Sequence, residues 1–497
     1  MAVEARSVEG ATGSAPGATG KDPGVLAVDL DGTLIRSDML LETWWSVVSQ
    51  KPGVAAGALA TLARDGRAAF KAVLAEAGAE NVDPAALPWN EAVLERVRAH
   101  RAAGGKAVLV TASDRRVAEG IATHLGLFDA VHASDGTTNL KGANKAAFLV
   151  ETYGERGFDY AGDHAVDVAV WAKARGAITV DAPDGLRQAA EGAAERAEHI
   201  GAPVRPLKAA IKAMRPHQWL KNVLVFVPVL AAHSLVVGDW LAALMAFVCF
   251  SMVASGVYLL NDLLDLASDR AHTRKRNRPL ASGALPLLTG SIMAPALLGG
   301  GVLLAAITTP GAFLGVLILY GILTTAYSFV LKRQLLLDVL TLAGLYTIRI
   351  VAGGAATGIE ISPWLLALST FLFFSLAAIK RQAELVANLA EGKEGASGRA
   401  YLTTDLQIVT NMALSAGYVS VLVLALYITS DTVATLYGQP LILWCICPVL
   451  LYWISRAVML THRGQMDDDP VVFAIKDKVS ILCGALMVVI FGAGMVL

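Results

Sequence analysis

The sequence predicts two fold classes in one chain, an N-terminal α/β domain with a parallel sheet and a C-terminal all-α transmembrane bundle of about nine helices. The first observation is composition, because 55% of the 497 residues are hydrophobic and the mean hydropathy of +0.54 exceeds that of ordinary soluble enzymes. The second is distribution, since charged residues are frequent up to about Pro206 and long uncharged stretches dominate beyond it. We therefore expect a soluble domain fused to an integral membrane domain.

The chain divides into four predicted segments. Residues 1–23 are rich in small residues and contain no apolar core of a signal peptide, so they are predicted to be a disordered tail. Residues 24–200 are expected to form the α/β domain, residues 201–221 a linker with an interfacial helix, and residues 222–497 the membrane domain. The formal net charge of -1 gives no bias toward nucleic acid, and we expect no nucleic-acid partner.

Five short apolar runs predict the strands of the α/β domain. They read VLAVDLDGT, KAVLVTAS, FDAVHAS, FDYAGD and GAITVDA, and helical patterns separate them, as in a parallel sheet. Between the first two runs, residues 37–98 form a helical insert that is too long for a simple crossover. We expect this insert to be a cap that closes over the strand ends.

Uncharged stretches predict the membrane helices. At about 20 residues per crossing, we place the spans at residues 222–238, 240–261, 279–331 (two spans), 335–357, 361–379, 406–430, 432–455 and 479–497. Alternate loops carry clusters of Lys and Arg, whereas the loops between them carry none. The positive-inside rule therefore predicts an inner (cytoplasmic) membrane protein whose N-terminal domain and basic loops are cytosolic and whose C-terminus is outside.

Two carboxylates follow the first predicted strand. Asp29 and Asp31 are two residues apart, so both side chains can face one crevice, and Gly32 lets the backbone turn. A carboxylate that attacks phosphorus and a second that protonates the leaving oxygen require this arrangement. The pattern therefore indicates phosphoryl transfer.

Three further polar elements follow in the order that such chemistry requires. Thr111 ends the VLVTAS run, Lys145 lies in KGANK with Lys141 as the alternative, and Asp163 and Asp167 lie in GDHAVD. The hydroxyl can hold a phosphate oxygen, the ammonium can offset charge in the transition state, and the acidic pair can help to hold Mg²⁺.

These elements together resemble the haloacid dehalogenase (HAD) superfamily, and the position of the insert resembles that of its phosphoserine phosphatase-type members. The resemblance covers about residues 24–194 and implies a Rossmann-like sheet and an aspartyl-phosphate mechanism. It implies Asp29 as nucleophile, Asp31 as acid/base, Thr111 and Lys145 as phosphate ligands, and Mg²⁺ on Asp29, Asp163 and, directly or through water, Asp167. The alternative is a relic of the fold that only regulates or scaffolds.

A second acidic motif lies where the second predicted span ends. Asp262, Asp265 and Asp269 have the spacing i, i+3 and i+7, so they line one face of a predicted helix together with Asn261. With Mg²⁺ such carboxylates can bind a diphosphate. A charge cluster that only sets the topology is the alternative, and it does not explain three carboxylates on one face. The basic residues that follow can meet phosphate oxygens: Lys275, Arg276 and Arg278.

The motif NDxxDxxxD at the end of the second predicted span resembles that of the UbiA superfamily of intramembrane prenyltransferases. The resemblance covers roughly residues 207–497 and implies a helical bundle with a cytosol-facing polar cavity that opens sideways to lipid. Ordinary members carry a second Asp-rich motif in the loop after the sixth span, where this chain reads AAIKRQAELVANLAEGKEG, with Lys380, Arg381 and Glu384. This departure argues against an ordinary prenyl diphosphate as the donor.

Other segments point to one branch of that superfamily. RPHQWLKNVLVFVP, KRNRPLASG, AYSFVLKRQLLLD, YTIRIVAGG, KRQAEL and DDPVVFAIKDKV resemble decaprenyl-phosphate 5-phosphoribosyltransferases. The resemblance implies phosphoribosyl pyrophosphate as donor and a polyprenyl (decaprenyl) phosphate of the bilayer as acceptor. A lipid phosphate is already anionic near neutral pH, so it needs no general base.

The resemblance also implies roles for the polar residues of the membrane domain. By this resemblance, Mg²⁺ and the donor diphosphate would be held by Asn261, Asp262, Asp265 and Asp269, of which Asp262 and Asp265 would be catalytic. The donor phosphates would be contacted by Lys275, Arg276, Arg278, Lys380 and Arg381. The sugar or the lipid phosphate would be contacted by Lys221, Tyr327, Lys332 and Arg349.

Three roles stay open in the sequence. Arg349 lies deep in a span, where a charge usually serves function, and an ion pair with Asp338 is disfavoured because a helix separates the two by about 16 Å. Glu384 either orients the arginine three residues before it or pairs with Lys380. The acidic run 467–469 is predicted to be a solvated loop, with a metal role as the alternative.

Together the two halves predict a bifunctional, Mg²⁺-dependent enzyme. The phosphatase domain would remove the 5-phosphate that transfer leaves on the lipid, giving polyprenyl-phosphoryl-ribose, by resemblance a precursor of an arabinofuranose donor for cell-envelope glycan. A short linker near residues 184–206 would raise the effective concentration of bound lipid. The alternatives are an ordinary prenyltransferase with an aromatic acceptor and a membrane-anchored phosphatase with an inactive membrane domain. The prenyl length and the oligomeric state stay open, a homo-oligomer included.

Overall fold

The computed structural model describes residues 23–78, 82–134, 140–203, 206–395, 399–430, 433, 437–466 and 469–496. The chain forms two compact units. The first consists of Met1–Pro206 and Leu266–Leu287, and the second of Leu207–Asp265 and Leu288–Leu497. The predicted tail up to residue 22, together with Asp467 and Asp468, lies outside the described residues.

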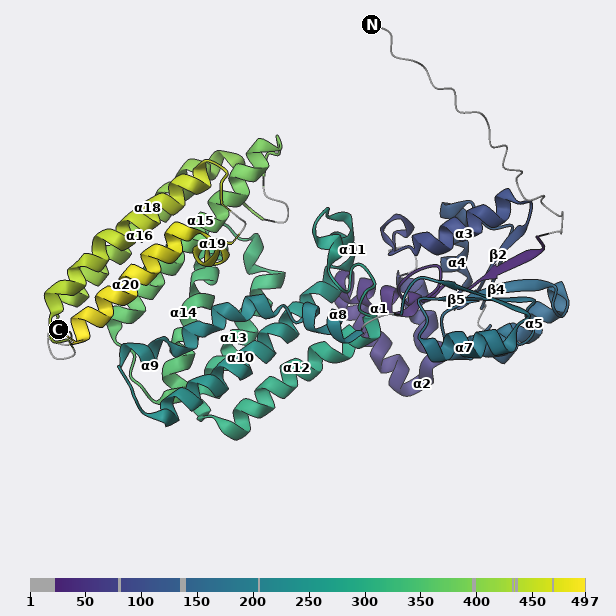
Figure 1. Ribbon diagram of the computed structural model, residues 1–497, viewed down its shortest axis with the longest axis horizontal. Helices are drawn as coiled ribbons and strands as arrows, with labels where there is room; N and C mark the ends of the chain where they lie inside the picture. The colour runs from purple at the N-terminus through teal and green to yellow at the C-terminus, as the bar shows by residue number, and fades with distance from the viewer. Residues whose placement is uncertain are drawn as a thin grey trace, which may run out of the picture. The chain divides into compact units, whose positions relative to one another are not determined.

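The first unit contains a parallel six-stranded sheet in the order β3-β2-β1-β4-β5-β6, as Figure 1 shows in part. Five of these strands confirm the predicted runs. Because the strand order reverses on either side of β1, the chain segments that follow β1, β2 and β4 meet at one edge of the sheet. The strands are β1 (Val25–Val28), β2 (Lys106–Asp114), β3 (Ala130–Ser134), β4 (Phe158–Gly162), β5 (Gly176–Val180) and β6 (Arg196–Ile200).

Helices cover both faces of this sheet (Figure 1). Successive residues of a strand point to opposite faces, so Leu26 and Val28 pack with α3 (Glu91–Ala102) and α4 (Arg115–Leu125). Ala27 points the other way, and the helices on that face are α5 (Ala143–Tyr153), α6 (Val168–Trp171) and α7 (Asp184–Ala193). The predicted α/β class is confirmed.

The insert between β1 and β2 is helical, as predicted. It contains α1 (Met39–Gln50), α2 (Pro52–Gly78) and the 3₁₀ turn η2 (Pro84–Ala86) before α3. The backbone of α2 kinks at Gly66, where φ is 83°. Asp38 caps α1 by accepting a hydrogen bond from the Leu41 amide at 3.1 Å. The insert therefore begins with a capped helix that starts at Met39.

The segment Leu266–Leu287 belongs to the same unit as this insert. It contains α11 (Leu266–Ala271) and η5 (Lys275–Asn277). The guanidinium of Arg270 meets both carboxylate oxygens of Glu42 on α1, at 2.9 and 2.5 Å. Both side chains are buried, so this bidentate pair is shielded from solvent.

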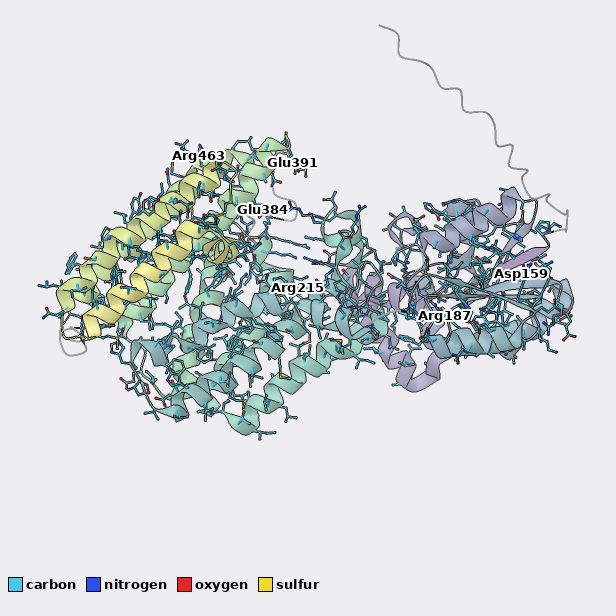
Figure 2. All side chains as sticks on the ribbon, in the orientation of Figure 1. Asp159, Arg187, Arg215, Glu384, Glu391 and Arg463 are labelled. Carbon is cyan, nitrogen blue, oxygen red and sulfur yellow. The ribbon has the colours of Figure 1, made fainter. Side chains whose placement is uncertain are left out.

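The prediction of a short linker at residues 184–206 was wrong. That stretch contains α7 and β6, which extend the sheet by one edge strand. β6 was not predicted because its residues, RAEHI, are polar and mostly exposed, and its backbone pairing with β5 leaves no apolar pattern. Arg196 of β6 and Arg175, the latter at 2.9 Å, pair with the buried Asp159 of β4, which Figure 2 labels.

The second unit contains the membrane-spanning helices, and the protein is an integral membrane protein. Among the described residues, eight helices are long and apolar enough to cross a bilayer. Their shared apolar surfaces form three buried clusters within the bundle. The helices are α10 (Val237–Leu264), α12 (Leu287–Thr308), α13 (Gly311–Phe329), α14 (Leu337–Thr357), α15 (Pro363–Ala390), α16 (Leu406–Ile428) after η7 (Thr403–Asp405), α18 (Ile446–His462) after η8 (Pro440–Cys445), and α20 (Lys478–Val496).

The first stretch predicted to span, residues 222–238, is not one long helix. After α8 (Pro206–Ala213), the chain forms the 3₁₀ helix η4 (Pro216–Phe226) and the short helix α9 (Val227–Ala231). Their apolar character serves packing inside the bundle, since Val225 and Val229 are fully buried. Gly353 of α14 permits this approach, because a Cβ there would lie 2.1 Å from the Val225 carbonyl oxygen.

One further predicted boundary was wrong. The segment KRQAEL was predicted to lie in a loop, but α15 remains helical to Ala390. Its residues are good helix formers, and several of them pack inward. The remaining short elements are η6 (Leu331–Arg333) before α14 and α19 (Pro470–Lys476) before α20.

A buried ion cluster joins α13, α14 and α15, and we call it the Asp338 cluster. Asp338 is fully buried and lies 2.6 Å from Arg381 and 2.9 Å from Arg399. Glu384, labelled in Figure 2, pairs with both arginines. Tyr327 donates to Asp338 at 2.9 Å. The cluster therefore balances two guanidinium groups with two carboxylates in a setting of low dielectric.

We expect Asp338→Asn to destabilise the fold by about 3 to 5 kcal/mol, because buried arginines lose their shared carboxylate. Thermal unfolding of the detergent-solubilised protein measures the effect as a lower Tm. Glu391→Gln is the matched control, since its pair with Lys393 leaves about 60% of each side chain exposed and contributes little. Equal Tm values for the two variants would contradict the assigned importance of the Asp338 cluster.

Candidate active sites

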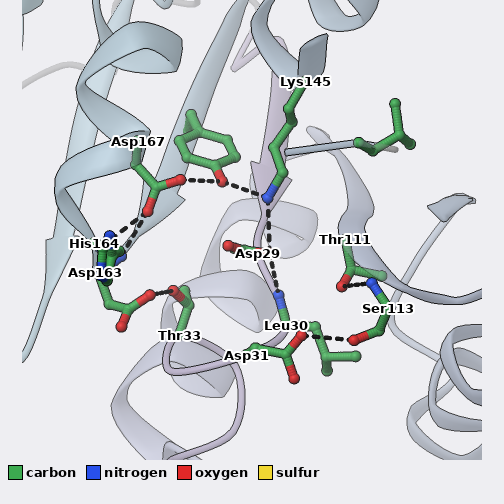
Figure 3. Close-up of polar contacts among 12 residues, drawn as sticks. Asp29, Leu30, Asp31, Thr33, Thr111, Ser113, Lys145, Asp163, His164 and Asp167 are labelled. Carbon is green, nitrogen blue, oxygen red and sulfur yellow. Dashed lines mark hydrogen bonds and ion pairs between the residues drawn. The ribbon is translucent and has the colours of Figure 1, made fainter. Parts of the chain in front are cut away.

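The first candidate site lies at the carboxyl edge of the sheet, where the segments after β1, β2 and β4 meet (Figure 3). Asp29 follows β1, and its backbone amide donates to the Ala161 carbonyl of β4 at 3.0 Å. The ammonium of Lys145, from α5, lies 2.8 Å from the Asp29 carboxylate. Lys145 is 3% exposed, so the ion pair is held in place and partly desolvated. Lys141 is exposed, and it is Lys145 that meets Asp29.

Tyr160 orders the charged groups around Lys145. Lys145 donates to the Tyr160 hydroxyl at 2.9 Å, and this hydroxyl donates to Asp167 at 2.9 Å. The other oxygen of Asp167 accepts hydrogen bonds from the backbone amides of Asp163 and His164. Sequence reasoning missed Tyr160. It lies on β4 two residues before Gly162, and residues two apart on a strand share one face of the sheet.

Three carboxylates converge at this edge. Asp29, Asp163 and Asp167 each offer an oxygen, and these atoms lie within 4.8 Å of one another. Burial, followed by repulsion from Asp29 and Asp167, raises the pKa of Asp163 from 3.8 to about 8. Such mutual repulsion is what a divalent cation removes, and carboxylate oxygens are the ligands that Mg²⁺ prefers. These residues therefore fit Mg²⁺.

Gly32 makes this convergence sterically feasible. Its φ is +76°, and a Cβ at this position would lie 2.2 Å from a carboxylate oxygen of Asp163. Thr33 donates to the other oxygen of Asp163 at 3.2 Å. The turn after β1 thus requires a residue without a side chain so that Asp163 can approach.

Asp31 is placed to handle a proton. It accepts hydrogen bonds from the Ser113 hydroxyl at 2.6 Å and from the Met39 amide, the first residue of α1, at 2.7 Å. Burial, followed by repulsion from Asp38, raises the pKa of Asp31 from 3.8 to about 7. A carboxyl group with such a pKa can hold a proton near neutral pH and release it to a leaving oxygen.

Thr111 and Ser113 lie together near the end of β2. Thr111 is fully buried, and its hydroxyl accepts a hydrogen bond from the Ser113 amide at 3.0 Å. Thr111 therefore shapes the end of β2, while Ser113 reaches Asp31. Sequence reasoning missed Ser113, although it lies two residues beyond Thr111 and shares its strand face.

The second acidic motif does not lie on one continuous helix. α10 ends at Leu264, and Asp265 has non-helical backbone angles, so Asp269 lies on α11. The predicted single face therefore holds only up to Asp265. Asn261 donates to Ser328 at 2.9 Å.

The first and last aspartates of this motif are buried, and each pairs with an arginine. Asp262, 2% exposed, lies 2.5 Å from Arg215, and Asp269, 1% exposed, lies 2.5 Å from Arg278. Sequence reasoning missed Arg215, which precedes η4 in the RPHQWLKN segment and has a φ of 54°. The remaining basic candidates of this region, Lys275 and Arg276, are exposed on η5.

The candidates farther along the membrane unit divide between buried and accessible positions. Arg381 is fully buried in the Asp338 cluster, so its predicted contact with donor phosphates is not supported by its surroundings. Glu384 pairs with Arg381, which answers the question left open by the sequence. Tyr327 belongs to the same cluster, and Lys332 lies partly buried on η6.

Arg349 is buried deep in α14. Its guanidinium donates to Asn222 at 2.9 Å and to the Tyr320 hydroxyl at 3.2 Å, and it does not pair with Asp338. The prediction that these two would not pair is confirmed. Asp469, predicted to be solvated, is instead mostly buried and lies 2.6 Å from Lys221.

Both units match known protein families. The profile of the UbiA prenyltransferase family matches residues 222–482. The profile of haloacid dehalogenase-like hydrolases matches residues 26–171.

Three relatives illustrate the extent of the similarity. The uncharacterized protein y4nM of Sinorhizobium fredii is 37% identical over 469 residues, which cover 93% of this chain and 89% of that protein. The nodulation protein NoeC of Azorhizobium caulinodans is 40% identical over 56% of this chain and 90% of its own. The decaprenyl-phosphate phosphoribosyltransferase of Mycobacterium tuberculosis is 38% identical over 43% of this chain and 72% of its own.

Solved structures align with each unit separately. A UbiA homolog from Archaeoglobus fulgidus bound to DMAPP and Mg²⁺ has a TM-score of 0.42 and 14% identity, covering 57% of this chain and 99% of that one. A substrate-bound phosphoserine phosphatase has a TM-score of 0.26 and 17% identity, covering 39% of this chain and 99% of that one.

Proposed function

We propose that this chain, which belongs to the UbiA prenyltransferase family and carries an N-terminal haloacid dehalogenase-like hydrolase domain, transfers 5-phosphoribose from phosphoribosyl pyrophosphate to a polyprenyl phosphate and then removes the 5-phosphate. The observation that carries the proposal is the 38% identity, over 223 residues or 43% of this chain, to a decaprenyl-phosphate phosphoribosyltransferase. The second observation is the segment KRQAEL, which has basic residues where ordinary relatives are expected to carry a second Asp-rich motif.

In the proposed transfer, an oxygen of the lipid phosphate bonds to the anomeric carbon of the donor while the bond to pyrophosphate breaks. Asp262, Asp265 and Asp269 are proposed to hold Mg²⁺, which would neutralise the leaving pyrophosphate. Asn261 orients one end of this motif through Ser328. The basic residues proposed to contact the donor phosphates are Lys275, Arg276 and Arg278.

The proposed phosphatase step uses the carboxylates at the sheet edge. Asp29 attacks the phosphorus of the terminal phosphate and forms an aspartyl phosphate, while Asp31 gives a proton to the leaving sugar oxygen. Asp31 then accepts the proton of the water that hydrolyses the aspartyl phosphate. Lys145 is held 2.8 Å from Asp29, where its charge offsets that of the phosphoryl oxygens. Mg²⁺ on Asp29, Asp163 and Asp167 would screen the nucleophile from the phosphate charge.

The order of the two steps follows from their chemistry. Transfer leaves a phosphate monoester at the sugar 5-position, and a phosphatase of this type hydrolyses such a group. We propose that both steps occur on the cytosolic side, and the distribution of basic loops supports this proposal through the positive-inside rule. A shared chain raises the effective concentration of the lipid product for the second step.

Mass spectrometry of lipids tests the proposed function. The purified full-length protein is incubated with Mg²⁺, phosphoribosyl pyrophosphate and decaprenyl phosphate. We expect a ribosylated lipid without a terminal phosphate, together with one pyrophosphate released per lipid. A parallel incubation with a prenyl diphosphate and an aromatic acceptor is the comparison. Product in that arm alone would overturn the proposal in favour of ordinary prenyl transfer.

A further inference from the structure

Two lysines of the membrane unit converge on one carboxylate, and we call these three residues the Asp469 cluster. The ammonium of Lys221 lies 2.6 Å from one oxygen of Asp469, and that of Lys380 lies 3.9 Å from the same oxygen. Lys221 comes from η4, Lys380 from α15, and Asp469 from the residue before α19. Segments far apart in the sequence thus bring these charges together.

The positive charge of this cluster exceeds its negative charge. Two ammonium groups face a single carboxylate, whose side chain is 15% exposed. The 3.9 Å separation from Lys380 is too long for a hydrogen bond, and among the described residues the three donors of this ammonium have no hydrogen-bond acceptor. Within the described residues, no carboxylate other than Asp469 forms an ion pair with either lysine.

A third buried cation strengthens this excess. Arg349 lies one turn beyond Tyr346 on α14, and its guanidinium is 5.8 Å from the centroid of the Tyr346 ring. The Lys221 ammonium is 5.6 Å from the same ring. In the part of the chain that the structure describes, Arg349 has amide, hydroxyl and carbonyl partners but forms no ion pair. Buried cations without full compensation are costly, so this region favours an incoming anion.

Asp469 has a second partner to which it can turn. Its other oxygen accepts a hydrogen bond from the Val471 amide at 3.0 Å and caps α19. Although burial opposes it, attraction from Lys221 and Lys380 holds the pKa of Asp469 below its ordinary value. The carboxylate is therefore charged near neutral pH, and an anion that displaces it from the lysines leaves it hydrogen-bonded to the backbone.

We propose that the Asp469 cluster binds the phosphate head of the lipid acceptor, and that Asp469 occupies the lysines until this phosphate replaces it. The inference rests on the proposed function for the identity of the acceptor. A phosphate monoester near neutral pH carries more charge than a carboxylate and has three terminal oxygens, so it can engage both ammonium groups at once. The net charge of the cluster suits such a group without a metal ion, whereas the donor diphosphate is proposed to bind the acidic motif.

Direct binding to the full-length protein in nanodiscs tests this site. The probes are farnesyl phosphate, farnesol, inorganic phosphate and phosphoribosyl pyrophosphate with Mg²⁺. We expect Lys221→Met and Lys380→Met each to weaken farnesyl phosphate binding at least about tenfold, because each removes a charged hydrogen bond. Binding of farnesol and of phosphoribosyl pyrophosphate should stay within about twofold of wild type.

Asp469→Asn is the most direct test of the proposed displacement of Asp469. Asn preserves the cap of α19 but removes the competing charge, so farnesyl phosphate should bind more tightly, by about threefold or more. Inorganic phosphate should rank the variants in the same order of affinity as farnesyl phosphate does. It should bind each of them more weakly, because it shares the head group but lacks the tail. Weaker farnesyl phosphate binding in Asp469→Asn, with an unchanged Tm, would overturn the displacement proposed for Asp469.

Matched controls separate a local effect from loss of folding. Lys393→Met removes an exposed lysine, and Asp477→Asn changes an aspartate that pairs with Arg456 and precedes α20, and both should bind farnesyl phosphate as wild type does. If the lysine variants instead weaken only the binding of phosphoribosyl pyrophosphate, the lysines bind the donor and the inference is wrong. If the wild-type protein forms ribosylated lipid but the two lysine variants bind farnesyl phosphate as tightly as wild type, the inference is refuted and the proposed function is not. If farnesyl phosphate binding does depend on the two lysines but the wild-type protein forms no ribosylated lipid, the proposed function is refuted instead.

Discussion

Asp29→Asn should stop the reaction sequence at a ribosylated lipid that still carries its terminal phosphate. The amide of Asn cannot attack phosphorus, so the dephosphorylation rate should fall at least about a thousandfold. Transfer of phosphoribose should continue at the wild-type rate, because Asp29 belongs to the first unit and the acidic motif begins in the second. Mass spectrometry of the lipid products distinguishes the two species by the mass of one phosphate.

Asp114→Asn is the matched control for this variant. Asp114 is the last residue of β2 in the same sheet, but it caps α4 through the Arg116 amide, a role that Asn can fill. We expect its products to match those of wild type. Fully dephosphorylated lipid from Asp29→Asn at the wild-type rate would show that the fused domain acts by another route or that it is not the phosphatase for this lipid.

Asp262→Asn and Asp265→Asn should abolish formation of the ribosylated lipid, again by at least about a thousandfold. Each change removes a charged oxygen from the site proposed to hold Mg²⁺ and the donor diphosphate. Dephosphorylation of separately supplied phosphoribosylated lipid should persist in both variants, because the carboxylates at the sheet edge are unchanged. Chelation of Mg²⁺ should stop both steps in wild type.

Asp239→Asn tests whether any change of charge on the same helix has this effect. Asp239 lies at the opposite end of α10, where it accepts a hydrogen bond from Ser234 at 2.5 Å. We expect transfer at the wild-type rate and a Tm close to that of wild type. Because Asp262 pairs with Arg215, a Tm measurement must show that Asp262→Asn still folds. Normal transfer by both motif variants would show that these two carboxylates do not hold the donor diphosphate.

Much of the fold was predictable because it depends on local pattern. Buried strands are continuous apolar runs, and membrane helices are long uncharged stretches, so both are visible in the sequence. β6 was missed because an edge strand is held by backbone pairing with β5 and carries polar side chains. The stretch 222–238 was predicted to be one helix because apolar composition does not distinguish a continuous helix from the 3₁₀ helix and short α-helix that form there.

The site was predictable in its chemistry and less so in its contacts. The motifs containing Asp29, Asp163 and Asp262 are compact in sequence, so their carboxylates could be singled out from spacing and resemblance. Tyr160 contacts Lys145 of α5, and Ser113 contacts Asp31 in the turn after β1. Nothing in the neighbouring sequence of Tyr160 or Ser113 distinguishes either one from a packing residue. The burial of Arg381 was not foreseeable, because it depends on packing against α14, which carries its partner Asp338.

The sequence by itself determined the two fold classes, the family resemblances and the identity of the carboxylates and cations available for chemistry. Only the tertiary structure decided which of these charges meet. Lys221 and Asp469 are 248 residues apart and become partners because helix packing brings η4 and the start of α19 together. Coulombic attraction and desolvation depend on distance and burial, and neither quantity can be read from the spacing of residues along the chain.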